Sequence, residues 1–314
     1  MPSPSRKMIP YRRRRGDRGR QTRRWLKEIF HSENFRPKKS LGQHFLVNYR
    51  FLCYIAALAE IKESDLVVEI GAGTGALTAL LAERGAEVLA VEIDAFLCRI
   101  AGEYLRDYCN VKVLEKDILE GGQLNAEVAS EVKKRLKKKQ NLKVVGNLPF
   151  NIASATITAL LTSPLPVKLM LFTVQEEVAY RLAAGPGSKD YGFLSIMAQV
   201  HSEVEMRKRI SASAFWPEPE VKAAVVRLLP TRFHLKKILD KKIFTDLVKA
   251  LFTWRRKTIH SCLLRALAHL SAGRKNKAEV ERLLSLADID PRRRPEDLSL
   301  DELIRLSNLL SEET

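Results

Sequence analysis

The spacing of apolar residues divides the chain into two parts of different character. Between residues 60 and 230, short β-branched runs alternate with segments that carry apolar residues at helical spacing, whereas only helical spacing remains after Pro230. Strands that alternate with helices predict a mostly parallel sheet covered on both faces. The expected strands cover residues 66–70, 88–93, 111–114, 142–145, 167–174 and 223–229, and the expected helices 76–84, 95–108, 154–162, 241–251, 258–270, 278–286 and 298–310.

The expected architecture is therefore a Rossmann-like α/β domain over residues 36–230, followed by a small all-helical domain over residues 231–314. A hydrophobic fraction of 46% in 314 residues is ample for both cores. The formal net charge of +17 is concentrated at the start, where residues 1–40 hold 14 Lys and Arg but only 3 Asp and Glu. We expect residues 1–35 to form a basic, mobile extension that contacts a polyanion, with a solvated tail as the alternative.

The distribution of cysteines and of apolar residues indicates the cellular compartment in which the protein works. The four cysteines are scattered and form no C-x-x-C pair, which argues against a disulfide framework and a thiolate zinc site, so no metal is expected. The longest apolar-rich stretch outside the glycine-rich region, residues 51–61, is shorter than the ~20 residues that span a bilayer. These features favour a cytoplasmic protein without a membrane partner, while the Arg-rich, acid-poor start leaves an organelle transit peptide as the alternative.

A glycine-rich loop follows the first expected strand. Gly71, Gly73 and Gly75 join this strand to a helix, and Glu92 closes the next strand 21 positions after Gly71. Glycines allow the backbone to turn sharply and approach a ligand, and a carboxylate at the second strand end can accept hydrogen bonds from ribose hydroxyls. The pattern predicts a nucleotide site, although a tight glycine turn in any α/β protein would share it.

The residues around this loop point to the kind of nucleotide. The third glycine position of the dinucleotide fingerprint is absent, and Glu69 would repel a pyrophosphate but suits a cationic amino-acid group, as S-adenosyl-L-methionine carries. Asp117, at the end of the third strand, is placed to accept a hydrogen bond from an adenine amine. The alternative for Asp117 is an N-cap before Ile118.

A second motif, Asn147-Leu148-Pro149-Phe150, ends the fourth strand at the same edge of the sheet. The Asn147 amide oxygen, together with a backbone carbonyl, can accept both hydrogens of an exocyclic amine, and Phe150 offers a face on which an extruded base can stack. Accepting these hydrogens favours a pyramidal nitrogen whose lone pair is aimed at the methyl group, so positioning and electrostatics suffice. A plain turn is the alternative.

The order of these motifs resembles that of the KsgA family of ribosomal RNA small-subunit adenine dimethyltransferases. The resemblance covers residues 36–310, with Phe150 in place of the commoner tyrosine and a longer Arg-rich start. It implies methylation of two adjacent adenosines, twice each, near the 3′ end of small-subunit ribosomal RNA in a pre-ribosomal particle, by a monomer. Its motifs are Lys38–Leu46, Val68–Gly75, Val91–Asp94, Asn147–Phe150, Gln175–Ala179, Tyr191–Gly192, Phe215–Pro219 and Phe252–Lys257.

The same resemblance implies the roles of individual residues. S-adenosyl-L-methionine would be bound by the glycine loop, by residues of three other motifs and by Asp117, and Asn147 to Phe150 would be catalytic. The implied cofactor residues are His44, Leu46, Gly71, Gly73, Glu92, Asp117 and Asn147.

Three basic residues in the helical part are candidates for RNA binding. Arg255, Arg256 and Lys257 would form a phosphate clamp, with a solvated helix start as the alternative. Two further functions stay open: an Erm-type methylase of large-subunit RNA, and an organellar dimethylase that doubles as a transcription factor. The motif Phe252–Lys257 favours the small-subunit enzyme.

Overall fold

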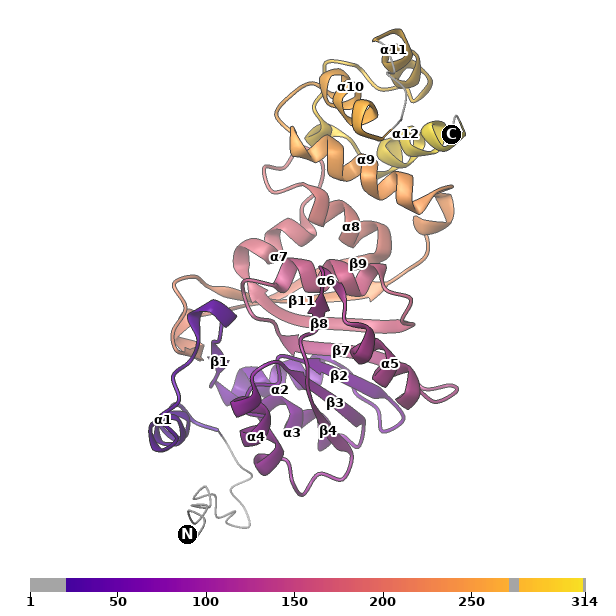
Figure 1. The fold of residues 1–314 in the computed structure, drawn as a ribbon. Coiled ribbons are helices and arrows are strands. Elements are labelled where there is room, and N and C mark those ends of the chain that lie inside the picture. The colour runs from indigo at the N-terminus through magenta and orange to yellow at the C-terminus, as the bar shows by residue number, and fades with distance from the viewer. Residues whose placement is uncertain (1–20, 271–276, 313–314) are drawn as a thin grey trace, which may run out of the picture.

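The computed structural model describes residues 21–270 and 277–312, so the expectation for residues 1–20 lies outside the described part. A seven-stranded sheet forms the centre of the molecule, with the order β4-β3-β2-β7-β8-β11-β9 (Figure 1). The first five strands in this order run parallel, and β11 runs antiparallel to both of its neighbours. The expected mostly parallel sheet is confirmed. Its strands are β2 (Leu66–Ile70), β3 (Glu87–Glu92), β4 (Val111–Glu115), β7 (Leu142–Asn147), β8 (Val167–Gln175), β9 (Ser202–Ile210) and β11 (Ala223–Pro230).

Edge strand β9 was not expected. Its sequence, SEVEMRKRI, lacks a β-branched run, and most of its residues are partly or fully exposed. Its backbone pairs along the whole length of β11. These backbone hydrogen bonds form the strand, although its side-chain pattern does not predict one. Polar and charged residues are typical of a strand at a sheet edge, so hydrophobic alternation alone misses it.

Helices cover both faces of the sheet, as Figure 1 shows. Alternate residues of each strand point to opposite faces, so Val67 packs with one layer of helices and Val68 with the other. The first layer contains α2 (Tyr49–Leu58) and α3 (Ala76–Ala82), with α4 (Ala95–Tyr104) beside β4. The second contains α5 (Ala126–Arg135), α6 (Ala153–Thr162), α7 (Glu176–Ala183) and α8 (Phe193–His201).

The C-terminal part is helical, as expected, and extends from the end of the sheet where β9 lies (Figure 1). Helix α8 joins the two cores: Leu194 and Ala198 pack in the core of the sheet, whereas Met197 and Val200 pack in the core of the C-terminal helices. The two parts thus share one buried helix on the N-terminal side of Pro230. The helices are α9 (Lys241–Thr253), α10 (Ile259–Leu270), α11 (Lys277–Leu286) and α12 (Leu300–Glu312).

Short elements complete the chain. The strand β1 (Phe45–Leu46) pairs with β10 (Phe215–Trp216), and β5 (Leu119–Glu120) pairs with β6 (Gln123–Leu124). None of the helices in the described ranges is long and apolar enough to cross a bilayer. Single 3-10 turns cover Lys39–Leu41, Ala212–Ala214, Leu235–Lys237 and Pro295–Asp297.

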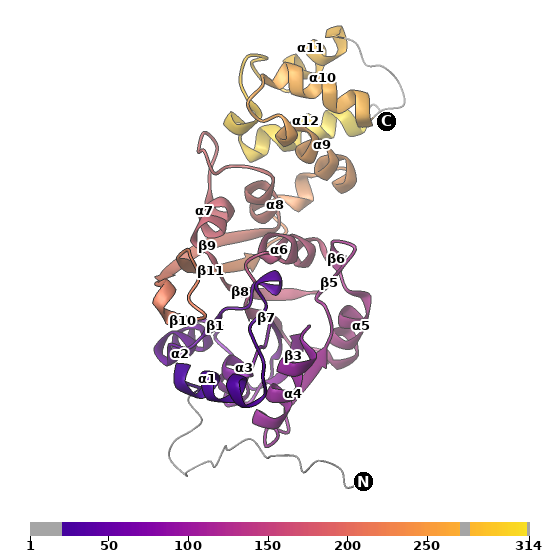
Figure 2. The same ribbon diagram turned by 60° about the vertical axis from the view of Figure 1, so that its left-hand side comes forward.

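Helix α1 (Arg23–Ser32) corrects the expectation that all of residues 1–35 form a mobile extension. The Thr22 side chain caps the helix by accepting a hydrogen bond from the backbone N–H of Trp25. Three apolar side chains at helical spacing, Leu26, Ile29 and Phe30, are buried in a cluster with α4. The basic composition suggested a mobile segment. Burial of these apolar side chains stabilises the docked helix in spite of its net charge. Figure 2 shows α1 lying alongside the sheet domain.

Candidate active site

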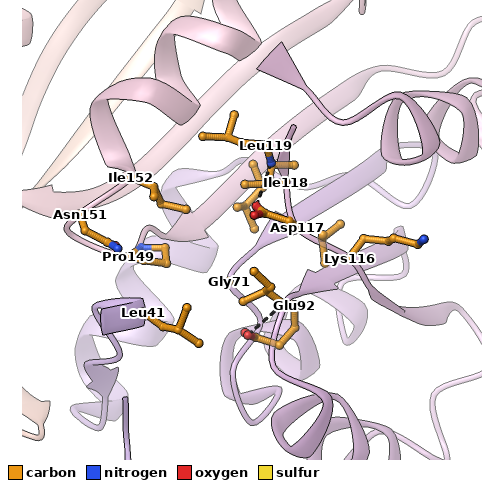
Figure 3. Close-up of a pocket in the computed structure, with 13 residues that line it drawn as sticks. Leu41, Gly71, Glu92, Lys116, Asp117, Ile118, Leu119, Pro149, Asn151 and Ile152 are labelled. Atoms are coloured by element: carbon orange, nitrogen blue, oxygen red, sulfur yellow. Dashed lines mark hydrogen bonds between the residues drawn. The ribbon is translucent and has the colours of Figure 1, made fainter. Parts of the chain in front are cut away.

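The predicted cofactor residues meet at the carboxyl ends of β2, β3, β4 and β7. A cavity of about 130 Å³ lies there, lined by Gly71, Glu92 and Asp117 on one side and by Pro149 and Ile152 on the other (Figure 3). Its walls are mostly apolar, which suits a flat base. Because parallel strands bring their carboxyl ends to one edge, residues more than 40 positions apart in the sequence share this space.

The glycine loop lies against the Asn147 strand end. Gly71 and Gly73 both have positive φ angles, +73° and +56°, which favour glycine. A Cβ atom on Gly71 would also come within 3.2 Å of the Asn147 carbonyl oxygen and 3.5 Å of the Pro149 ring. The loop therefore needs glycine at position 71 for its backbone conformation and for its close approach to the second motif.

Glu92 is held in a fixed orientation by backbone N–H groups. Its Oε2 accepts a hydrogen bond from Gly73 N at 2.8 Å, and its Oε1 accepts from Ile93 N and Asp94 N at 3.0 Å each. Burial raises the pKa of this carboxyl, although the backbone hydrogen bonds oppose the shift. The carboxylate thus lies between the glycine loop and the cavity, where the ribose is expected.

Asp117 lines the cavity from the segment after β4. Its Oδ1 accepts a hydrogen bond from Leu119 N at 2.9 Å, so it stabilises a turn and does not cap a helix. The residue is exposed, and Figure 3 shows its side chain on the same side of the cavity as Glu92. The alternative of an N-cap is wrong, because a short strand and not a helix follows Asp117. A contact between Asp117 and a ligand stays a prediction.

A second, smaller cavity of about 40 Å³ adjoins the first across Gly71. Glu69 lines it and is almost fully buried, with Oε2 making no hydrogen bond to any described residue. Burial raises the pKa of Glu69 to about 8. An uncompensated buried acceptor of this kind suits a ligand that brings a cation.

Leu46 of the short strand β1 lines this second cavity, whereas His44, just before β1, contacts the site through Asn147. The His44 carbonyl accepts a hydrogen bond from Asn147 Nδ2 at 2.8 Å, and its ring Nδ1 lies 2.8 Å from the Pro217 carbonyl oxygen. Leu46 is buried and forms part of the cavity wall. The structure thus brings both residues to the predicted site, His44 as an anchor for Asn147 and Leu46 as an apolar wall.

Asn147 leads the predicted catalytic motif. Because Nδ2 is used by His44, Oδ1 is the acceptor that faces away from this bond, and it is buried with no hydrogen bond to the described residues. Phe150 is partly buried, with its ring centre 5.4 Å from the His44 ring and 6.4 Å from the Phe215 ring. An acceptor and an aromatic face therefore stand beside the cofactor cavities, as the motif predicts.

Two residues that also line the second cavity, Gln21 and Leu26, were not expected from the sequence. Both come from the basic segment that was expected to be mobile. The helical spacing of Leu26, Ile29 and Phe30 is the signal that could have identified the helix. A contact between residue 21 and the glycine loop has no such signal, because it depends on the tertiary fold.

The basic triplet Arg255, Arg256 and Lys257 lies in the C-terminal helical part, away from the cavities. All three are exposed, but Arg255 is engaged within the protein: its Nη1 donates to the Lys189 carbonyl at 3.0 Å, and its Nε lies 3.7 Å from a Glu296 carboxylate oxygen. Arg255 thus ties the turn after α9 to the loop before α8, and phosphate binding by the triplet stays a prediction. Residues 21–270 and 277–312 contain no group of His, Cys, Asp and Glu arranged to hold a metal.

Known proteins are similar to this chain in sequence and in fold. The family model of ribosomal RNA adenine dimethylases matches residues 34–298. Ribosomal RNA small subunit methyltransferase A of Geobacillus sp. (strain WCH70) is 39% identical over 284 residues, covering 90% of this chain and 95% of that protein. The protein of the same name from Geobacillus kaustophilus is 40% identical over 285 residues, covering 91% of this chain and 94% of its own length.

Two solved structures share the fold at lower identity. A dimethyladenosine transferase from Plasmodium falciparum has a TM-score of 0.68 at 24% identity and covers 86% of this chain and 97% of its own. The 23S rRNA methyltransferase ErmE has a TM-score of 0.59 at 24% identity, with 85% and 99% covered. Together with the strand–glycine loop–helix geometry and the Asn147 motif, the family match over most of its length places this chain in the ribosomal RNA adenine dimethylase family.

Proposed function

We propose that this protein transfers methyl groups from S-adenosyl-L-methionine to the exocyclic amines of two adjacent adenosines near the 3′ end of small-subunit ribosomal RNA. The observation that carries the proposal is a pair of buried acceptors at one cavity, Glu69 Oε2 and Asn147 Oδ1, neither with a donor among the described residues. A buried polar group without a partner costs about 1–3 kcal/mol. The cationic amino-acid end of the cofactor would bring N–H donors to Glu69, and the amine of the target adenine would bring them to Asn147, so that binding of both would remove this cost.

The two cavities fit the two ends of such a cofactor. The apolar cavity beside Asp117 suits the adenine, Glu92 at the junction suits the ribose, and the cavity beside Glu69 suits the cationic amino-acid end. His44, Leu46, Gly71, Gly73 and Asn147 would complete the cofactor site. S-adenosyl-L-methionine supplies a methyl group on a positively charged sulfur.

The residues Asn147 to Phe150 would act on the target base. Asn147 Oδ1 and a backbone carbonyl accept the two hydrogens of the adenine amine and direct the nitrogen lone pair toward the methyl group. Phe150 stacks on the base after it leaves its helix. No strong base is required, because the proton can leave after the methyl group has arrived and the nitrogen has become cationic.

The small-subunit RNA is favoured over the Erm-type target by the relatives. The two Geobacillus proteins, each about 40% identical over nine tenths of this chain, are named for the small subunit, whereas ErmE is similar at 24% identity. These relatives are bacterial, which favours a cytoplasmic enzyme over an organellar one. We further propose that the protein acts as a monomer on a pre-ribosomal particle.

Primer extension across the 3′ region of small-subunit ribosomal RNA from a deletion strain tests this function. Dimethylation blocks the pairing edge of adenine, so two adjacent stops are expected with the intact gene and are expected to vanish on deletion. A plasmid copy should restore both stops, and a copy with Asn147→Ala should restore neither. Stops that persist in the deletion strain would reject the assignment.

A further inference from the structure

The N-terminal segment reaches the glycine loop through one buried side chain. Gln21 Nε2 donates to the Thr74 carbonyl oxygen at 2.8 Å, and the Thr74 hydroxyl donates in return to Gln21 Oε1. Gln21 is almost fully buried, and Thr74 lies between the two last glycines of the loop. Two hydrogen bonds therefore join the start of the described chain to the loop that is proposed to hold the cofactor.

Helix α1 fixes the place of Gln21. Arg23 Nη2 donates to the Ser213 and Phe215 carbonyls at 3.0 and 3.1 Å, and the apolar stripe of α1 packs against Leu97 and Ile100 of α4. Because the helix is anchored on two sides, Gln21 is positioned by tertiary packing and is not a loose terminus. Its amide forms part of the wall of the cavity that Glu69 also lines.

The chemistry of this wall matches an amino-acid group. Such a group carries an ammonium and a carboxylate, and Glu69 can take only the ammonium. An amide nitrogen has two hydrogens, and Gln21 uses one of them on Thr74. Much of the remaining wall is apolar, with side chains such as Leu26, Phe45 and Leu52.

We propose that Gln21 is a cofactor-binding residue that donates a hydrogen bond to the carboxylate at the amino-acid end of S-adenosyl-L-methionine, opposite Glu69. This inference rests on the proposed function. It gives the first helix a role in the site: α1 is the outer wall of the amino-acid end. The adenosine end lies against Asp117 and Pro149 and makes no use of α1.

Calorimetry with three ligands tests the proposal. S-adenosyl-L-methionine and S-adenosylhomocysteine carry the amino-acid end, whereas 5′-methylthioadenosine lacks it. Gln21→Ala should lower the affinity for the first two ligands by about tenfold and change the affinity for 5′-methylthioadenosine by less than twofold. Gln21→Glu keeps the size and the acceptor for Thr74 but places a carboxylate against a carboxylate, so it should weaken the first two at least as much.

Lys27→Ala is the matched control, because Lys27 is exposed on the same helix, and it should behave as the wild type with all three ligands. Equal losses for all three ligands in the Gln21 variants would assign Gln21 a purely structural role and overturn the inference. Affinities for the two amino-acid ligands that match the Lys27→Ala control would overturn it as well.

Glu92→Ala separates this inference from the proposed function. If it weakens all three ligands while Gln21→Ala has no effect, the cofactor site stands and the inference about Gln21 fails. If it leaves the affinities for all three ligands unchanged, the proposed cofactor site itself fails.

Hydrogen exchange gives an independent measurement on the wild type: S-adenosyl-L-methionine should alter exchange in residues 21–32, and 5′-methylthioadenosine should not. Unaltered exchange with both ligands would contradict the proposed contact.

Discussion

Asn147 donates a hydrogen bond from Nδ2 to the backbone carbonyl of His44 at 2.8 Å, and this bond fixes which side of its amide faces the ligand. The buried Oδ1 is left as an acceptor without a donor among the described residues. A buried acceptor that is already oriented needs no reorganisation when an amine arrives, which is the condition under which a dipole contributes most to a reaction rate.

Asn147→Ala should therefore lower the rate of methyl transfer far more than it lowers cofactor affinity. The amide orients the target amine in the transition state, and removal of one such preorganised group costs about 10²–10³ in kcat. Single-turnover methyl transfer and calorimetry measure the two effects separately. Near-normal single-turnover transfer by this variant would reject the catalytic role.

Phe150→Ala should reduce activity more than Phe150→Tyr. Stacking contributes about 1–3 kcal/mol per base, and tyrosine keeps the aromatic face. The partly buried Phe150 ring packs near His44 and Phe215, so the tyrosine variant should also keep these contacts. The comparison is made from kcat/KM on the same RNA particle, and equal losses in both variants would mean that stacking is not the role of Phe150.

The carboxyl of Glu69 should make cofactor binding depend on pH. Its pKa of about 8 means that it is mainly protonated at pH 7 in the empty protein, whereas an ammonium ligand favours the ionised form. Affinity for S-adenosyl-L-methionine should rise between pH 6.5 and 8.5, with release of a proton on binding. Calorimetry in buffers of different ionisation enthalpy detects this proton, and Glu69→Gln should abolish both effects.

The same carboxyl should make folding stability depend on pH with a defined sign. The folded state binds the Glu69 proton more tightly than the unfolded state, whose glutamate pKa is about 4.3. Its contribution to stability is therefore complete below that value and is lost as the pH rises through about 8. Urea unfolding across this range should show a shallower decline for Glu69→Gln than for the wild type.

The sequence predicted the centre of the fold better than its edges, for physical reasons. Buried strands such as β2 carry β-branched runs, and the glycine loop and the Asn147 motif follow them directly, so the site could be located by its chain order. Strand β9 was missed because it is an edge strand with polar residues. Arg255 illustrates a different limit, since its exposed basic side chain suggested phosphate although part of it binds the Lys189 carbonyl.

Gly146→Ala should destabilise the protein, because β7 lies unusually close to β2 at this point. A Cβ on Gly146 would lie 2.4 Å from the Ile70 carbonyl oxygen, so the backbone of one strand must shift. Overpacking of this kind costs about 1–3 kcal/mol or more. Gly102→Ala is the control: it lies in α4, where the added Cβ would meet no atom within 4 Å beyond its own stretch of helix, and it should stabilise by about 0.5–1 kcal/mol. Equal unfolding midpoints for the two variants would contradict this account of the close approach.

Deletion of residues 2–20 should weaken binding to the RNA particle and leave cofactor affinity intact. The deletion removes the run of four arginines at positions 12–15 but stops before Gln21, whose bonds to Thr74 and whose place in the cavity wall are thereby kept. If these arginines bind phosphates, the slope of log affinity against log salt should become shallower by roughly 0.7–0.9 for each phosphate that the truncated protein no longer neutralises. A transit peptide would be cleaved from the mature enzyme and would take no part in RNA binding. The salt slopes of full-length and truncated protein on the same particle therefore distinguish an RNA-binding segment from a transit peptide. Indistinguishable slopes would reject the RNA-binding role. A deletion that extends through residue 32 should in addition weaken S-adenosyl-L-methionine binding, because it removes the wall formed by α1.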